Sequence, residues 1–176
     1  MTPPRFTAAD AERAYDEWGA NCGPAAVAAI TGRTLDEVRP FLGDFERKRY
    51  TKPTLMWAIL DAVDARWRRL GPPLDWPLHG LARIQWHGPW TRPGVPPRAA
   101  YWHTHWVAAS RRGDEIGVFD INALGNGSGW CSLSDWSGRL VPWLLEQYEP
   151  KADGGWSITH AVEVTHPGGQ LMEARP

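Results

Sequence analysis

The sequence predicts an α+β fold in which helices precede an antiparallel sheet, and two observations support this. In the first half of the chain, helix-capping residues precede stretches of small or regularly spaced apolar residues. In the second half, short apolar or alternating runs are separated by turn residues. A chain of 176 residues corresponds to one domain, because domains typically contain ~100–150 residues. We therefore expect a single domain over residues 1–176, with a loose tail at 167–176.

Each expected helix has a start signal in the sequence. A capping Thr or Asn side chain accepts a hydrogen bond from a first-turn N–H, and a glycine that follows the last turn ends the helix. The expected helices, with their start and stop residues, are 8–18 (Thr7 with Asp10; Gly19), 22–30 (Asn21; Gly32), 34–42 (Thr34 with Glu37) and 55–70 (Thr51 or Thr54; Gly71).

Strands are expected where apolar residues run or alternate between turn signals. The segment 111–115, with the sequence RRGDE, is typical of a hairpin turn between two of these strands. A late helix is expected over residues 134–148, and Pro142 limits its continuity. The expected strands are 81–86, 99–110, 116–122, 130–133 and 156–165.

Charge and composition exclude several classes of protein. The chain has 19 Lys and Arg against 20 Asp and Glu, a net charge of −1 that argues against a nucleic-acid partner. It contains no apolar run near the ~20 residues of a membrane-spanning helix, so we expect no membrane partner. Residues 1–5 lack a secretory signal, and two cysteines make no disulfide framework, so we expect a reducing, cytoplasmic location.

Cys22 is the residue that points most directly to chemistry. It is expected in the first turn of a helix behind the Asn21 cap, where the helix dipole and unpaired N–H groups stabilise a thiolate. The alternative is that Cys22 is a small buried apolar residue, the usual state of a free cysteine. The second cysteine, Cys131, has no helix start before it and is expected to be structural.

A cysteine nucleophile needs a base that a third group orients. His103 and His105 would share a face of one strand, and Asp120 lies on the partner strand of the expected hairpin. With a turn centred near Gly113, His105 and Asp120 fall almost opposite each other, within reach of a hydrogen bond. The second choices are His103 as base and Asn122 as orienting group. Alternatively, Asp120 caps a turn and His105 is a half-buried structural residue.

These motifs resemble the papain-like cysteine peptidases of the double-glycine leader peptidase type (peptidase family C39). The resemblance rests on residues 21–28 (NCGPAAVA), 105–107 (HWV) and 118–120 (VFD), and it spans residues ~12 to ~125 in order and spacing. It implies a papain-like fold, with N-terminal helices packed on a C-terminal antiparallel sheet. It also implies a catalytic triad of Cys22, His105 and Asp120, a peptide or protein substrate and no cofactor.

One position departs from that pattern. Papain-like enzymes generally carry a Gln six residues before the nucleophile, and its amide donates to the oxyanion, whereas this chain has Asp16 there. An ionised carboxylate cannot donate, so Asn21 or another group would have to complete the oxyanion hole. The alternatives are an acyltransferase or deamidase on the same scaffold, or a catalytically impaired binding or adaptor module.

The other histidines and the tryptophans can be interpreted either as functional residues or as structural ones. His103 and His105 with Asp120, or with His79 and His87, match no strong zinc signature, and we expect no metal site. Some of the 12 tryptophans are candidates for lining a substrate cleft, with core packing as the alternative. These candidates are Trp18, Trp86, Trp90, Trp102 and Trp106.

Overall fold

Helices fill the first part of the chain and strands most of the second, so the predicted α+β class is confirmed. The computed structural model describes residues 2–96 and 102–165, and the expected tail at 167–176 lies outside these. The helices are α1 (Ala8–Trp18), α2 (Cys22–Thr31), α3 (Leu35–Val38), α4 (Phe45–Lys48), α5 (Pro53–Ala62), α6 (Leu133–Asp135) and α7 (Val141–Tyr148). The strands are β1 (Arg66–Arg69), β2 (His79–Trp86), β3 (Thr104–Arg112), β4 (Glu115–Phe119), β5 (Trp130–Ser132) and β6 (Trp156–Thr165).

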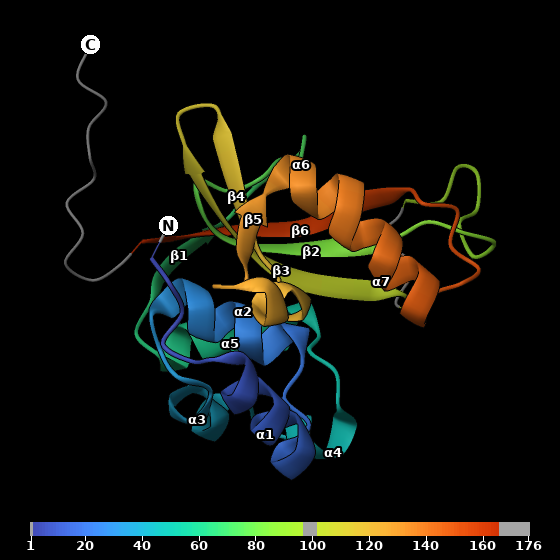
Figure 1. The fold of residues 1–176 in the computed structure, drawn as a ribbon. Helices are drawn as coiled ribbons and strands as arrows, with labels where there is room; N and C mark the ends of the chain where they lie inside the picture. Colours follow the sequence, from blue (N-terminus) through green and yellow to red (C-terminus); the bar gives the residue numbers. More distant parts are fainter. Residues whose placement is uncertain (1, 97–101, 166–176) are drawn as a thin grey trace.

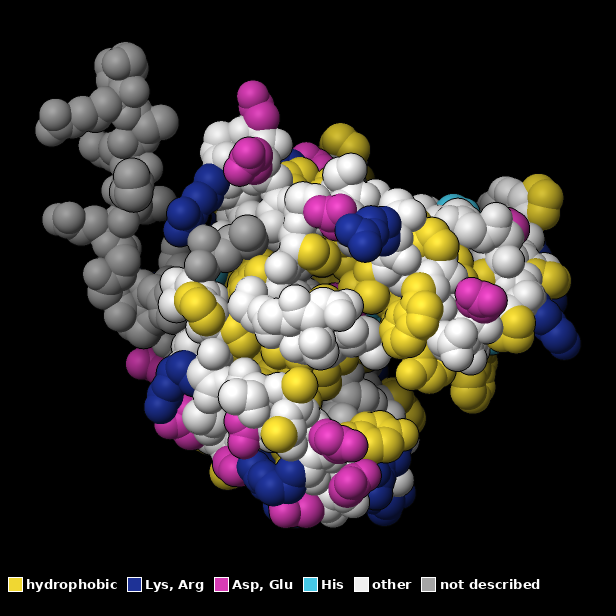
Figure 2. Space-filling model, in the orientation of Figure 1, with side chains coloured by type: hydrophobic (Ala, Val, Ile, Leu, Met, Phe, Trp, Pro, Cys, Tyr) yellow, Lys and Arg dark blue, Asp and Glu magenta, His cyan; other side chains and the backbone are white. Residues whose placement is uncertain are grey.

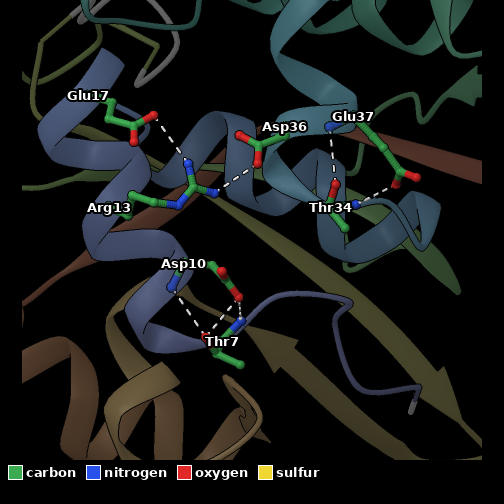
Figure 3. Close-up of polar contacts among 7 residues, drawn as sticks. All are labelled: Thr7, Asp10, Arg13, Glu17, Thr34, Asp36 and Glu37. Atoms are coloured by element: carbon green, nitrogen blue, oxygen red, sulfur yellow. Dashed lines mark hydrogen bonds and ion pairs between the residues drawn. The ribbon is translucent and has the colours of Figure 1, made fainter.

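Both predicted capping boxes are formed, and an arginine ties the two helices that they start (Figure 3). The Thr side chain accepts from the backbone N–H three residues on, and the acidic side chain at that position accepts from the Thr backbone N–H. Arg13 of α1 donates to Asp36 of α3 over 2.8 Å and to Glu17 over 3.2 Å. These contacts fix the outer helices on which α2 packs. The boxes are Thr7 with Asp10 and Thr34 with Glu37.

The six strands form one antiparallel sheet in the order β1-β6-β2-β3-β4-β5. The hairpin of β3 and β4 is present, but its turn contains two residues, because Arg112 pairs with Glu115. The pairing of Ala108 with Phe119 places Val107 opposite the position of Asp120, so the predicted register of His105 opposite Asp120 is two residues off. Since the shift is even, both side chains stay on one face and become diagonal neighbours.

The sheet separates two hydrophobic cores (Figure 1). Helices α2 and α5 lie against one face, with α1 and α3 outside them, whereas the segment from α6 to α7 covers the other. Along β3, Trp106 and Ala108 belong to the first core, and Val107 and Ala109 to the second. Because β3 is buried on both faces, its sequence is continuously apolar rather than alternating.

The helix expected over 55–70 is shorter, and its last part is a strand. Helix α5 ends at Ala62, Asp64 takes a left-handed φ of 56°, and Arg66–Arg69 pairs with β6 as an edge strand. The apolar stripe continues in space because Trp67 stacks on Trp57. The predicted helix and the observed strand therefore both place the Trp67 ring against the same hydrophobic core. The expected Thr caps are also wrong, since α5 begins after Lys52 with proline in its first turn.

The late helix is a sequence of short segments rather than one α-helix. Helix α6 passes into a π-helical turn over Trp136–Leu140 and then into α7, where Pro142 lies in the first turn. Over the described residues, no helix is both long and apolar enough to span a membrane. On the surface, hydrophobic side chains gather over α7, where Trp143 and Tyr148 are exposed (Figure 2).

Candidate active site

Cys22 is the first residue of α2, and its position is fixed by the cap that precedes it. The Asn21 side chain accepts a hydrogen bond from the Gly23 N–H over 3.2 Å and donates to the Arg49 carbonyl over 3.0 Å. First-turn N–H groups have no acceptor within their own helix, so the Cys22 N–H remains available to an anion. Residues 23–30 of α2 are buried, whereas Cys22 itself is half-buried.

The sulfur of Cys22 contacts β3 at a point beyond the end of the neighbouring strand β4. In a hairpin with a two-residue turn, the flanking pair is hydrogen-bonded, so the even-numbered residues of β3 direct their N–H groups toward β4. Strand β4 ends at Phe119, which leaves the Trp106 N–H without a partner on that side. This N–H donates to the Cys22 sulfur instead. The early end of β4 thus creates the place that the thiol occupies.

His105 lies between the thiol and a buried carboxylate. Its Nε2 is 2.7 Å from Oδ2 of Asp120, and its other ring nitrogen is left for the hydrogen bond that its side chain shares with Cys22. His105 is 8% exposed and Asp120 is fully buried. The structure therefore brings together the three residues that the sequence singled out, in the order sulfur, imidazole, carboxylate.

Asp120 is held by donors from three directions. Besides His105, the indole N–H of Trp136 donates to Oδ2 over 2.9 Å. The backbone and side-chain N–H groups of Asn122 donate to Oδ1 over 3.1 and 2.9 Å. Trp86 stacks on the His105 ring with a centroid separation of 5.9 Å. A fully hydrogen-bonded carboxylate of this kind keeps its charge when buried and cannot rotate away from the imidazole.

In this cluster, the interactions between the charged groups outweigh the effect of burial on each pKa. Burial alone raises the pKa of the Cys22 thiol, but the charge and hydrogen bond of His105 and the Trp106 N–H outweigh it and lower that pKa. Burial would lower the pKa of His105, yet Asp120 and Cys22 raise it well above its usual value. The pKa of Asp120 is lowered, since His105, Trp136 and Asn122 outweigh its burial. These shifts all act in the direction that favours the thiolate–imidazolium pair over the neutral pair.

His103, the second-choice base, is not part of this cluster. Strand β3 begins at Thr104, and His103 takes a left-handed φ of 61°, so it does not share the face of His105. Its Nδ1 lies 2.6 Å from Glu149, and its ring stacks on Trp90 at 3.6 Å between centroids. The prediction of His103 as a base is therefore wrong. Asn122, the second-choice orienting residue, contacts the carboxylate of Asp120 rather than the imidazole.

The two candidates for an oxyanion group have other positions. Asp16 is exposed on α1. Both ends of the Asn21 amide are engaged, one by Gly23 and the other by Arg49, because the side chain caps α2. Asn21 therefore serves the helix start, and the prediction that it donates to an oxyanion is not supported by its contacts. The Cys22 N–H is the donor that this geometry offers.

Three of the predicted cleft residues belong to the core. Trp18 is 1% exposed and packs edge-on against Phe45, and Trp106 is 2% exposed with its indole N–H on the Thr51 carbonyl. Trp86 is buried in the core on the other face of the sheet. These three predictions are wrong, because the large apolar area of the ring is removed from water here. Trp102 is 79% exposed and remains a candidate for contacting a substrate.

A separate cavity, with a volume of about 660 Å³, is lined by residues between Asn122 and Trp143. Asn122 and Gly129, which both contact Asp120, line it, and neither Cys22 nor His105 does. Cys131 lines this cavity, and burial together with nearby carboxylates raises the pKa of its thiol to about 11. The surroundings thus lower the thiol pKa of Cys22 but raise that of Cys131, which agrees with a structural role for Cys131.

Sequence reasoning missed two groups that shape the site. The indole of Trp136 follows Asp120 by 16 residues on another element, and the Trp106 N–H is a backbone group. Neither leaves a motif in the sequence. A two-residue turn at positions 113 and 114 predicts that the N–H groups of even-numbered β3 residues point toward β4. Together with the end of β4 at Phe119, this turn would have identified the Trp106 N–H as a donor without a strand partner.

We expect Trp136→Phe to lower the free energy of unfolding by about 1 kcal/mol, because it removes one donor from a buried carboxylate. Urea unfolding at pH 7 measures this. Trp76→Phe is the matched control, since the Trp76 ring packs edge-on against Trp136 in the same core. If both variants lose equal stability, the indole N–H contributes nothing beyond packing.

Among the described residues, no cluster of three or more His, Cys, Asp or Glu side chains is arranged to hold a metal ion. No protein-family model, curated protein or solved structure matches the chain.

Proposed function

We propose that this protein is a papain-like thiol hydrolase that cleaves peptide or amide bonds through Cys22, His105 and Asp120. The observation that carries the proposal is the chain of contacts from the Cys22 sulfur through the His105 ring to the Asp120 carboxylate. Helices on one face of an antiparallel sheet, with the cysteine at a helix start and the histidine at a strand start, agree with it.

In this reaction the Cys22 thiolate attacks the carbonyl carbon and forms a C–S bond. The His105 imidazolium gives its proton to the leaving amine as the C–N bond breaks, which leaves a thioester. His105 then takes a proton from water, and the resulting hydroxide attacks the thioester and releases the acid. Asp120 stays ionised throughout and keeps the imidazole in the required orientation. The Cys22 N–H, at the start of α2, stabilises the oxyanion.

We expect Cys22 to react with iodoacetamide at pH 6 at least about tenfold faster than a model thiol, because its lowered pKa gives it a larger thiolate fraction than the model thiol has at this pH. The rate is measured from pH 5 to 8 on a Cys131→Ser protein, so that one cysteine remains. Hydrolysis should show a bell-shaped pH profile. Its acid limb reports the lowered pKa of Cys22 and its alkaline limb the raised pKa of His105.

The control is a Cys22→Ser protein that retains Cys131. Since the pKa of Cys131 is raised to about 11, it should react more slowly than the model thiol throughout this pH range. The proposal is rejected if Cys22 reacts no faster than the model thiol at any pH tested.

The second candidate is a binding or adaptor module that retains the fold without catalysis, and the exposed Asp16 in place of the oxyanion Gln favours it. A Cys22→Ala protein that keeps its full biological effect would support this candidate. Mass spectrometry of covalent intermediates with amide and ester probes distinguishes hydrolysis from acyl transfer or deamidation.

A further inference from the structure

Strand β2 carries a buried arginine that the proposed chemistry does not use. Arg83 is 4% exposed, and it forms no ion pair with a carboxylate of residues 2–96 or 102–165. Its Nη1 donates to the Thr159 hydroxyl over 3.2 Å, whereas its Nε is buried without a partner. Burial lowers the pKa of Arg83, with no opposing charge to offset it. A buried charge normally has a counter-charge, so its absence here indicates a ligand.

A second unpartnered polar atom lies beside it. Gln85 is 1% exposed, and its Oε1 is buried without a hydrogen bond. Its Nε2 donates to the carbonyls of Trp86, Trp102 and His103, so the amide cannot turn to exchange the two ends. Since residues two apart in a strand share a face, Arg83 and Gln85 present a cationic fork and a carbonyl acceptor to the same side of β2.

The sheet is distorted at this point. The register between β2 and β6 shifts after Arg83, and Thr159 is the extra residue in β6. The Thr159 hydroxyl accepts from the Arg83 side chain and donates to the Arg83 carbonyl over 3.2 Å. Bulges of this kind redirect side chains and occur often beside active sites. Here the bulge occupies Nη1 and leaves the guanidinium edge formed by Nε and Nη2, which matches the two oxygens of a carboxylate.

The pair lies close to the thiol. Arg83 pairs with Trp106 across β2 and β3, and the Trp106 N–H contacts the Cys22 sulfur. Neighbouring strands are about 4.8 Å apart, so the backbone of Arg83 lies one strand spacing from that of Trp106, whose N–H contacts the sulfur.

Resting on the proposed hydrolase activity, we propose that Arg83 and Gln85 form a substrate subsite for a peptide with a carboxylate two or three residues from the scissile bond. Arg83 binds the carboxylate through its free edge, and Gln85 accepts a backbone N–H of the same peptide. The carboxylate belongs either to an acidic side chain or to the end of the peptide chain.

The test measures binding, so that it does not depend on catalysis. A Cys22→Ala protein is titrated calorimetrically with acetyl-Ala-Glu-amide, acetyl-Ala-Ala with a free carboxylate, and acetyl-Ala-Ala-amide. We expect one of the two acidic peptides to bind at least about tenfold more tightly than the neutral one, and which of them does so identifies the source of the carboxylate. Arg83→Met should abolish this preference, and Gln85→Leu should weaken all three peptides.

Arg111→Met is the matched control, because Arg111 is a partly buried arginine at the other end of β3. If Arg83→Met does not fold, Arg83→Lys keeps the charge but lacks the fork, and it should lose most of the preference. The inference is wrong if all three peptides bind equally or not at all, or if the preference survives in the Arg83 variants. Because iodoacetamide reactivity of Cys22 is measured separately, such a result would leave the hydrolase proposal intact.

Discussion

Asp120→Asn should cost about 3 kcal/mol of folding free energy at neutral pH and slow alkylation of Cys22 at pH 6 by at least about tenfold. The carboxylate is fully buried and accepts from three residues, whereas an amide offers one acceptor and brings two N–H groups among existing donors. Without the negative charge, the pKa of His105 falls. The direct effect of Asp120 on Cys22 is to raise the thiol pKa, but the effect of the His105 charge, which lowers it, is larger, so loss of the imidazolium raises the pKa of Cys22 on balance. The thiolate population at pH 6 therefore decreases.

The stability difference between wild type and Asp120→Asn should depend on pH. The folded pKa of Asp120 is lowered, so its contribution is present above about pH 4 and is lost as pH falls through the folded value. The folded pKa of His105 is raised, so its contribution is complete below about pH 6.5 and is lost as pH rises through the folded value. The difference should thus be largest between these limits.

Urea unfolding from pH 3 to 9 measures this difference. Asp75→Asn is the control, because Asp75 is an exposed carboxylate paired with Arg111 and should change stability little. A difference for Asp120→Asn that is the same at every pH would show that the buried pair is not charged, and the proposed thiolate–imidazolium state would then be untenable.

The positions of Cys22 and His105 were predictable because local signals determine them. The Asn21 cap and Gly32 fix the ends of α2, and the hairpin signal near Gly113 fixes the approach of β3 and β4. The register was wrong by two residues, yet the contact survived because alternation along a strand depends only on parity. Local chemistry therefore predicts which side chains share a face better than which residues pair.

Other features could not be read from the sequence because tertiary contacts decide them. Arg66–Arg69 satisfies a helical stripe through Trp67 but pairs with β6, which follows it by almost 100 residues. His103 leaves its expected face because Trp90 and Glu149 hold it. The hydrogen bond from the Trp136 indole to Asp120 is likewise a contact between separate elements that leaves no motif in the sequence. In each case a partner that is distant in sequence overrides the local pattern.

Gly23→Ala should destabilise the protein by about 1–3 kcal/mol and displace the thiol from His105. A Cβ at position 23 would lie 2.1 Å from Oγ1 of Thr51 and within 2.8 Å of its Cβ, so one of the two segments must move. Thr51 cannot rotate away at low cost, because it is buried, β-branched and fixed by the Trp106 indole on its carbonyl. Movement of α2 is the remaining way to relieve the clash, and α2 carries Cys22.

The experiment combines urea unfolding with iodoacetamide alkylation at pH 6, where the variant should lose the rate advantage of the wild type. Gly138→Ala is the matched control, since a Cβ there meets no atom within 4 Å. The steric account also predicts that Thr51→Ala, which removes the two nearest atoms, recovers part of the stability and of the rate in a double variant. If Gly23→Ala lowers the free energy of unfolding by the same amount when position 51 is alanine, a clash with Thr51 is not the reason that position 23 requires glycine. The close approach of α2 to the segment before α5 would then not be what positions the thiol.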